Sequence, residues 1–145
     1  MKKTFHRIIM SALLTVLATV AASAQCYIVG SDNEWKPNTA AAELTETATT
    51  GVYEGDVTFV DGAQYFAVTQ HLTTGDADWT EFNKNRFAPS VFDAMLVINE
   101  PMTMVKGRDA SFKVPVAGTT YRMRIDFNTL TVTLLGDFPD KLYVW

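Results

Sequence analysis

The sequence has few of the residues from which covalent cross-links, metal sites or nucleic-acid surfaces are built. It holds one cysteine and two histidines in 145 residues, so an internal disulfide is impossible and the Cys/His spacings of zinc sites are absent. Basic residues are also scarce, with twelve Lys and Arg against sixteen Asp and Glu. This balance argues against nucleic acid as a partner, and stability must come from an apolar core.

Residues 1–24 differ from the rest of the chain. They begin with Lys2, Lys3 and Arg7, continue through an almost uninterrupted apolar run over 8–22, and end on small side chains. This pattern is typical of a secretory signal peptide and is too short and too lightly flanked for a membrane-spanning helix. Cleavage after Ala24 leaves nine basic and sixteen acidic residues, a formal charge of −7. We therefore expect an exported protein of the periplasm, outer membrane or cell surface, with no transmembrane segment after residue 24.

The single cysteine lies directly after this segment. Cys26 stands where a lipoprotein carries its acylated cysteine, but Gln25 precedes it, and lipoprotein processing requires a small residue there. A lipid anchor at Cys26 is thus possible but not favoured. The alternative is a partly buried cysteine in a strand.

The remainder, residues 25–145, shows alternation of apolar and polar residues rather than a helical period. The clearest pair is 121–127 and 130–134, which flank Asn128 and Thr129 and predict a hairpin. Seven or eight short strands with turns about every ten residues predict one all-β domain, an immunoglobulin-like antiparallel β-sandwich. The predicted strands cover residues 27–29, 52–59, 64–70, 91–98, 110–116, 121–127, 130–134 and 141–145.

Two long polar segments, 31–50 and 71–90, interrupt this rhythm, and each contains one tryptophan, Trp35 or Trp79. We interpret them as loops, the usual position of function on a rigid β scaffold. Residues 25–85 carry ten acidic and two basic side chains, a net charge of −8. This half of the domain should repel phosphate, sulfate and uronate groups.

No catalytic constellation stands out, so we expect no enzymatic activity and no cofactor. His71 is the only histidine after residue 24 and has no nucleophile or acid at a suggestive spacing. Asp76 and Asp78, with Glu81 nearby, resemble the start of a calcium loop but lack its glycine and its spaced glutamate. We therefore predict no metal site.

The two loop tryptophans remain as candidates for function. Each is surrounded by polar residues, so the indole either folds back as a loop anchor or stands out as a binding platform. A flat ring suits the apolar face of a sugar, whose hydroxyl groups bond to nearby polar side chains.

Four short motifs, in order, resemble the starch-binding modules of the SusE and SusF outer-membrane proteins of gut Bacteroidetes. They are Tyr27-Ile28-Val29-Gly30 followed by Trp35, then Gly51-Val52-Tyr53-Glu54, then Tyr65-Phe66-Ala67-Val68, and finally the segment 118–134. The resemblance implies a carbohydrate-binding β-sandwich over 25–145. The glucoamylase and AMP-activated-kinase carbohydrate-binding modules are related sandwiches.

The resemblance also implies a binding site. Trp35 and Trp79 fall where such modules carry sugar-stacking tryptophans, and Asn83, Lys84 and Asn85 where they carry hydrogen-bonding residues. Tyr65 stands in the strand that often supplies a lysine to the sugar. The expected partners are a neutral polysaccharide or oligosaccharide, such as starch or malto-oligosaccharide, and outer-membrane glycan-uptake proteins.

A second hypothesis needs no sugar. In it the domain is a structural or adhesion-type sandwich whose tryptophans pin the long loops and whose strand 141–145 pairs with a partner protein.

Overall fold

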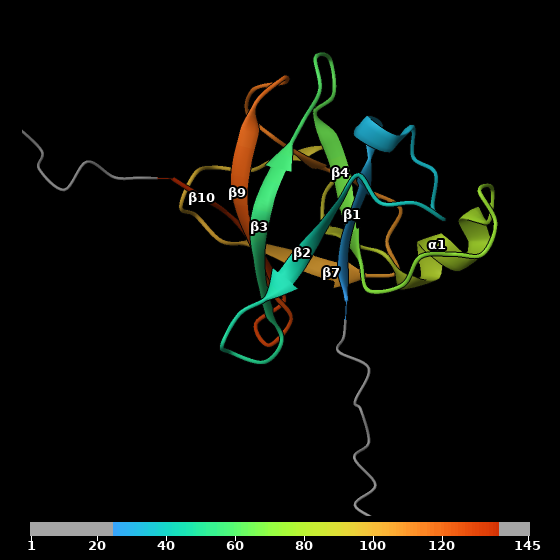
Figure 1. Cartoon of the computed structure of the whole chain (residues 1–145), viewed down its shortest axis with the longest axis horizontal. Coiled ribbons are helices and arrows are strands. Elements are labelled where there is room, and N and C mark those ends of the chain that lie inside the picture. The colour runs from blue at the N-terminus through green and yellow to red at the C-terminus, as the bar shows by residue number, and fades with distance from the viewer. Residues whose placement is uncertain (1–24, 137–145) are drawn as a thin grey trace, which may run out of the picture.

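A computed structural model describes residues 25–136, which form a closed antiparallel β-barrel of eight strands (Figure 1). The predicted signal peptide, 1–24, and the predicted last strand, 141–145, lie outside the described residues. One 3-10 helix, η2 (Ser31–Asn33), and one α-helix, α1 (Trp79–Asn85), accompany the strands. The strands are β1 (Cys26–Gly30), β2 (Ala42–Glu46), β3 (Val52–Thr58), β4 (Tyr65–Thr69), β5 (Phe87–Pro89), β6 (Ala94–Met95), β7 (Met102–Lys106), β8 (Phe112–Lys113), β9 (Thr120–Asp126) and β10 (Thr131–Leu135).

The predicted all-β class is confirmed, but the predicted immunoglobulin-like sandwich is wrong. Around the barrel the strands follow the order β1, β2, β3, β9, β10, β7, β5, β4 and back to β1. β1 is hydrogen-bonded to β2 on one edge and to β4 on the other, and β7 joins β10 to β5 in the same way. An open sandwich would leave these strands as edges. Alternation in the sequence shows which side chains face inward, but not which strands become neighbours.

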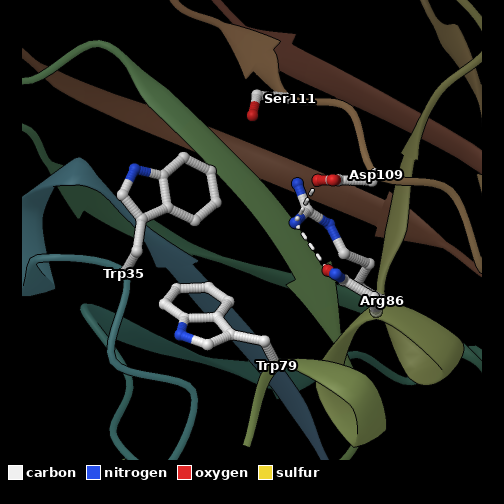
Figure 2. A pocket seen from close by; sticks show the side chains of 6 residues that line it. Trp35, Trp79, Arg86, Asp109 and Ser111 are labelled. Carbon is white, nitrogen blue, oxygen red and sulfur yellow. Dashed lines mark hydrogen bonds and ion pairs between the residues drawn. The ribbon is translucent and has the colours of Figure 1, made fainter. Parts of the chain in front are cut away.

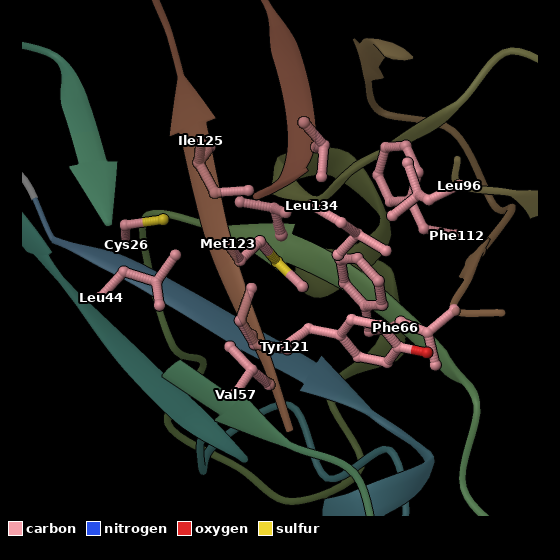
Figure 3. Close-up of a cluster of buried hydrophobic side chains, with 14 of the residues drawn as sticks. Cys26, Leu44, Val57, Phe66, Leu96, Phe112, Tyr121, Met123, Ile125 and Leu134 are labelled. Carbon is pink, nitrogen blue, oxygen red and sulfur yellow. The ribbon is translucent and has the colours of Figure 1, made fainter. Parts of the chain in front are cut away.

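Five predicted strands are confirmed as β1, β3, β4, β9 and β10. Along β9 the inward residues Tyr121, Met123 and Ile125 are buried while Arg122 and Arg124 are exposed, as the alternation predicted. Figure 3 shows these side chains meeting the other inward-facing residues in one continuous core.

Other predictions were wrong. The apolar segment 91–98 was expected to be a buried strand, yet only Ala94–Met95 is a strand, and Phe92 is 72% exposed. The predicted strand 110–116 is reduced to Phe112–Lys113. β2 and β5 lie within the segments predicted as loops, and β7 was not predicted at all. β2 and β7 each place only two apolar residues on the core, Ala42 and Leu44 or Met102 and Met104, so the alternation in each strand is too short to stand out in the sequence.

Gly30 allows β1 and β4 to approach each other closely. A Cβ atom on Gly30 would overlap the Tyr65 carbonyl oxygen and lie 2.8 Å from the Cα of Phe66. Any side chain at this position would therefore push apart the two strands that close the barrel.

We expect Gly30→Ala to lower the free energy of unfolding by about 1–3 kcal/mol, the usual cost of overpacking. Gly75→Ala is the matched control, because a Cβ there would meet no atom within 4 Å. Urea unfolding of both variants measures the difference. Equal stability of the two variants would show that the close approach is not required.

Cys26 is fully buried in the core, beside Leu44 and Met123 in Figure 3. Burial raises the pKa of its thiol from 9.0 to about 12. The folded state therefore holds this proton more tightly than the unfolded state does. The resulting stability is complete below pH 9 and is lost as the pH rises toward 12.

Between these pH values the natural chain should lose up to about 1.4 kcal/mol of unfolding free energy per pH unit more than Cys26→Ala does. Urea titrations of both proteins at pH 8, 9.5 and 10.5 would measure the two slopes. The contributions of other titrating groups to the two slopes cancel, because both proteins contain those groups. Parallel slopes would contradict burial of the thiol.

Candidate functional site

Trp35 is held by a compact turn directly after η2. Glu34 and Trp35 both adopt the left-handed backbone conformation, with φ of 57° and 58°. This conformation is unfavourable for a bulky residue, so surrounding contacts must maintain it. The Trp35 N–H donates to the Gly30 carbonyl at 2.9 Å, and the Gly30 N–H donates to the Asn33 side chain at 2.9 Å. The turn thus fixes the direction in which the indole leaves the chain.

Trp79 is the first residue of α1. The Asp78 carboxylate caps this helix by accepting the Glu81 N–H at 3.3 Å. One turn later, Phe82 is fully buried, and its ring contacts Trp79 edge to face, with 6.0 Å between the ring centroids. Trp79 itself remains 40% exposed.

Both tryptophans are positioned by a small apolar cluster on the outside of the barrel. Val29 of β1 and Ala67 of β4 are paired neighbours that point away from the main core, and Phe82 covers them. Trp35 packs against the same cluster. The two loops, remote in sequence, therefore meet over the β1–β4 pair, on the side of the barrel where Figure 1 shows α1.

Together the tryptophans line an open hollow of about 340 Å³. Figure 2 shows the indoles on one side of it, with the guanidinium of Arg86 and the carboxylate of Asp109 facing them. The lining residues are Trp35, Trp79, Asn83, Arg86, Asp109 and Ser111.

Arg86 is the buried charge of this hollow, with a side chain only 4% exposed. Its Nη1 donates to Asn83 at 3.1 Å and to Asp109 at 3.3 Å, while its Nη2 donates to the Ala110 carbonyl. Its Nε has no partner within residues 25–136. Burial lowers the pKa of the guanidinium, and Asp109 acts in the opposite direction. Arginine nevertheless stays protonated at neutral pH, so the hollow contains a permanent cation beside an exposed carboxylate.

The same guanidinium also contacts two aromatic rings. Its Cζ lies 5.3 Å from the centre of the Trp35 ring and 5.2 Å from that of Phe82. Cation–π contacts of this kind strengthen when the cation is shielded from water. Arg86 therefore connects the end of α1 to Trp35 and to the segment before β8.

The structure brings together three of the six predicted site residues, Trp35, Trp79 and Asn83. Lys84 and Asn85 do not line the hollow, although they lie on α1, and Asn85 donates to the Glu81 carbonyl within the helix. Tyr65 is also absent from the hollow, and its ring faces Lys113, whose Nζ lies 5.4 Å from the ring centre.

Sequence reasoning missed the other three lining residues, Arg86, Asp109 and Ser111. Arg86 lies near the end of a segment interpreted as a polar loop. Asp109 directly precedes the predicted strand 110–116 and Ser111 lies within it, more than seventy residues after Trp35. No spacing in the sequence links these positions. Only the pairing of the strands places them beside the tryptophans.

The structure gives no support to a metal site at the acidic residues of the second long segment or to a catalytic role of His71. Within residues 25–136, no three His, Cys, Asp or Glu side chains lie close enough to hold a metal ion, so Asp76, Asp78 and Glu81 form no such group. His71 is exposed. In the same part of the chain, no helix combines the length and apolar character needed to cross a bilayer.

Arg86→Ala should lower the free energy of unfolding by about 2 kcal/mol or more, because it removes buried packing and several hydrogen bonds. Asp109→Ala should cost less than about 1 kcal/mol, since this carboxylate is 80% exposed. Arg86→Lys should fall between them, because lysine keeps the charge but not the planar fork. Urea unfolding measures all three, and equal losses for Arg86→Ala and Asp109→Ala would contradict the connecting role of Arg86.

Comparison with protein-family models, curated proteins and solved structures gives no match for this chain. The resemblance to SusE and SusF modules therefore stays a prediction from sequence motifs. The function has to be argued from the hollow itself.

Proposed function

We propose that the chain is a non-catalytic carbohydrate-binding domain and that a neutral glucan, such as a malto-oligosaccharide, binds in the Trp35–Trp79 hollow. The observation that carries this proposal is the placement of both tryptophans, Trp35 from a turn and Trp79 from α1, around one open hollow on the barrel. A hollow of about 340 Å³ lies at the lower end of the usual size of small-ligand sites.

The chemistry of the lining suits a sugar. The exposed part of Trp79 offers a flat apolar surface to the C–H face of a pyranose. Asn83, Asp109 and Ser111 supply amide, carboxylate and hydroxyl groups that can bond to sugar hydroxyls. Apolar stacking combined with polar groups at the rim is the usual composition of such a site.

The two interpretations of the tryptophans, anchor and platform, are compatible in this geometry. Trp35 packs on the Val29–Ala67–Phe82 cluster and at the same time lines the hollow. An anchored ring is a better platform, because little conformational freedom is lost when the ligand binds.

The charge distribution favours an uncharged ligand. Arg86 is already compensated by Asp109, which lies 3.3 Å from it. The surrounding half of the chain, residues 25–85, has a net charge of −8. Sulfated or uronate-rich glycans should therefore be repelled, whereas neutral ones are unaffected.

The proposal is tested by titrating residues 25–145 with malto-oligosaccharides while following tryptophan fluorescence. We expect weak, saturable binding at millimolar sugar, because a few stacking contacts must offset the lost freedom of a flexible chain. Trp79→Ala should weaken binding by roughly tenfold, the loss expected for one stacking ring. A sulfated dextran should not compete.

Phe92→Ala is the matched control, since Phe92 is an exposed aromatic that does not line the hollow. It should bind sugar as the natural chain does. The α-glucan proposal fails if millimolar sugar produces no response or if Trp79→Ala responds unchanged. In that case the structural or adhesion-type alternative, in which the tryptophans only pin the loops, becomes the better explanation.

A further inference from the structure

A tyrosine and a lysine lie side by side on the outer face of the barrel, next to the tryptophan hollow. β4 and β8 pair antiparallel, with Phe66 opposite Phe112 and Tyr65 opposite Lys113. Phe66 and Phe112 point into the core, so Tyr65 and Lys113 point outward, because successive side chains of a strand face opposite ways. The Lys113 Nζ lies 5.4 Å from the centre of the Tyr65 ring. We call these two residues the Tyr65–Lys113 pair.

The same outward row of side chains leads into the hollow. Ser111, which lines the hollow, lies two residues before Lys113 on the same face of the chain. Ala67, part of the cluster that positions both tryptophans, lies two residues after Tyr65 on the outer face of β4. Two residues of a strand span about 7 Å, a distance that the next sugar units of a glucan chain can cover. The Tyr65–Lys113 pair therefore continues the hollow past Ser111, which Figure 2 shows at the edge opposite Trp79.

The hydroxyl group of Ser31 fixes Tyr65 relative to Trp35. It accepts the Tyr65 N–H at 3.0 Å and donates to the Tyr65 carbonyl oxygen at 3.0 Å. Ser31 is also the first residue of η2, and the turn that follows η2 directs Trp35 into the hollow. The spacing of the two rings is thus set before a ligand arrives, which lowers the entropic cost of binding to both.

The chemistry of the pair suits a neutral sugar. Tyr65 supplies an aromatic ring and a hydroxyl that can donate and accept, and the Lys113 ammonium supplies three donors. Within residues 25–136, no carboxylate oxygen lies within 4 Å of the Lys113 Nζ, since the ion pairs of this part of the chain all involve other residues. The ammonium is therefore available to the oxygen atoms of a sugar.

We propose that Tyr65 and Lys113 form a second sugar subsite, so that a glucan chain bound in the hollow extends past Ser111 onto them. This inference rests on the proposed function of the hollow. It adds that the site recognises a chain of several sugar units rather than a single unit or a disaccharide. Loss of the pair should therefore weaken the binding of long chains and spare that of short ones.

The test compares maltose with maltohexaose, each titrated into residues 25–145 and followed by calorimetry. We expect maltohexaose to bind about tenfold more tightly, because it contacts both subsites while maltose occupies the hollow alone. Tyr65→Ala should weaken maltohexaose binding about fivefold, the loss of one aromatic contact, and leave maltose binding unchanged. Trp79→Ala should weaken the binding of both sugars.

Two further variants complete the test. Lys113→Met, which removes the ammonium but keeps the length of the side chain, should weaken maltohexaose binding about threefold and likewise spare maltose. Tyr27→Ala is the matched control, since Tyr27 is a half-buried tyrosine on the outer face of β1, opposite Thr69 and four residues along β4 from Tyr65. It should bind both sugars as the natural chain does. Unchanged maltose binding shows in addition that a variant is folded.

The outcomes distinguish failure of this inference from failure of the proposed function. If both sugars bind in a Trp79-dependent way but Tyr65→Ala and Lys113→Met leave maltohexaose binding unchanged, the second subsite is overturned and the hollow stands. If Tyr65→Ala weakens the binding of both sugars equally, Tyr65 only supports the hollow, and the second subsite is likewise overturned. If neither sugar binds to the natural chain, both proposals fail.

Discussion

β1 and β4 pair antiparallel over four residues, from Tyr27 opposite Thr69 to Gly30 opposite Phe66. This one pairing closes the barrel, and it is possible only because position 30 has no side chain. On its inner side, Ile28, Phe66 and Val68 enter the main core. Without it, β1 and β4 would be free edges and the eight-stranded ring would open into a twisted sheet.

The outer side of the same pair builds the candidate site. Val29 and Ala67 lie opposite each other and provide the apolar surface on which Phe82 packs, and Phe82 places Trp79 at the rim of the hollow. β1 ends at Gly30, whose carbonyl accepts the Trp35 N–H, so the first tryptophan is set by the end of the same strand. Arg86 then joins these parts, because its planar guanidinium contacts the rings of Trp35 and Phe82 and donates to the Asp109 carboxylate and the Ala110 carbonyl. The candidate site therefore depends on the same β1–β4 pairing that closes the barrel.

The sequence predicted those parts of the fold in which one strand carries its own signal. β9 shows three inward apolar residues separated by arginines, and β10 alternates similarly, so both strands were correctly predicted. β2 and β7 each place only two apolar residues on the core, which makes their alternation too short to detect. The segment 91–98 misled the prediction in the opposite direction, because most of its large apolar residues are exposed and only Leu96 enters the core. Hydrophobicity alone cannot tell a core strand from an uncovered surface.

The sequence by itself determined the all-β class of residues 25–136 and showed that Trp35 and Trp79 stand among polar neighbours rather than in apolar runs. These properties depend on composition and on neighbours along the chain, so they can be recognised from the sequence alone. Only the tertiary structure decided that the strands close into a barrel and that Arg86, Asp109 and Ser111 join the tryptophans in one hollow. Those outcomes depend on which strand edges pair, and that choice is made by long-range hydrogen bonding and by packing across the core, which no local pattern encodes.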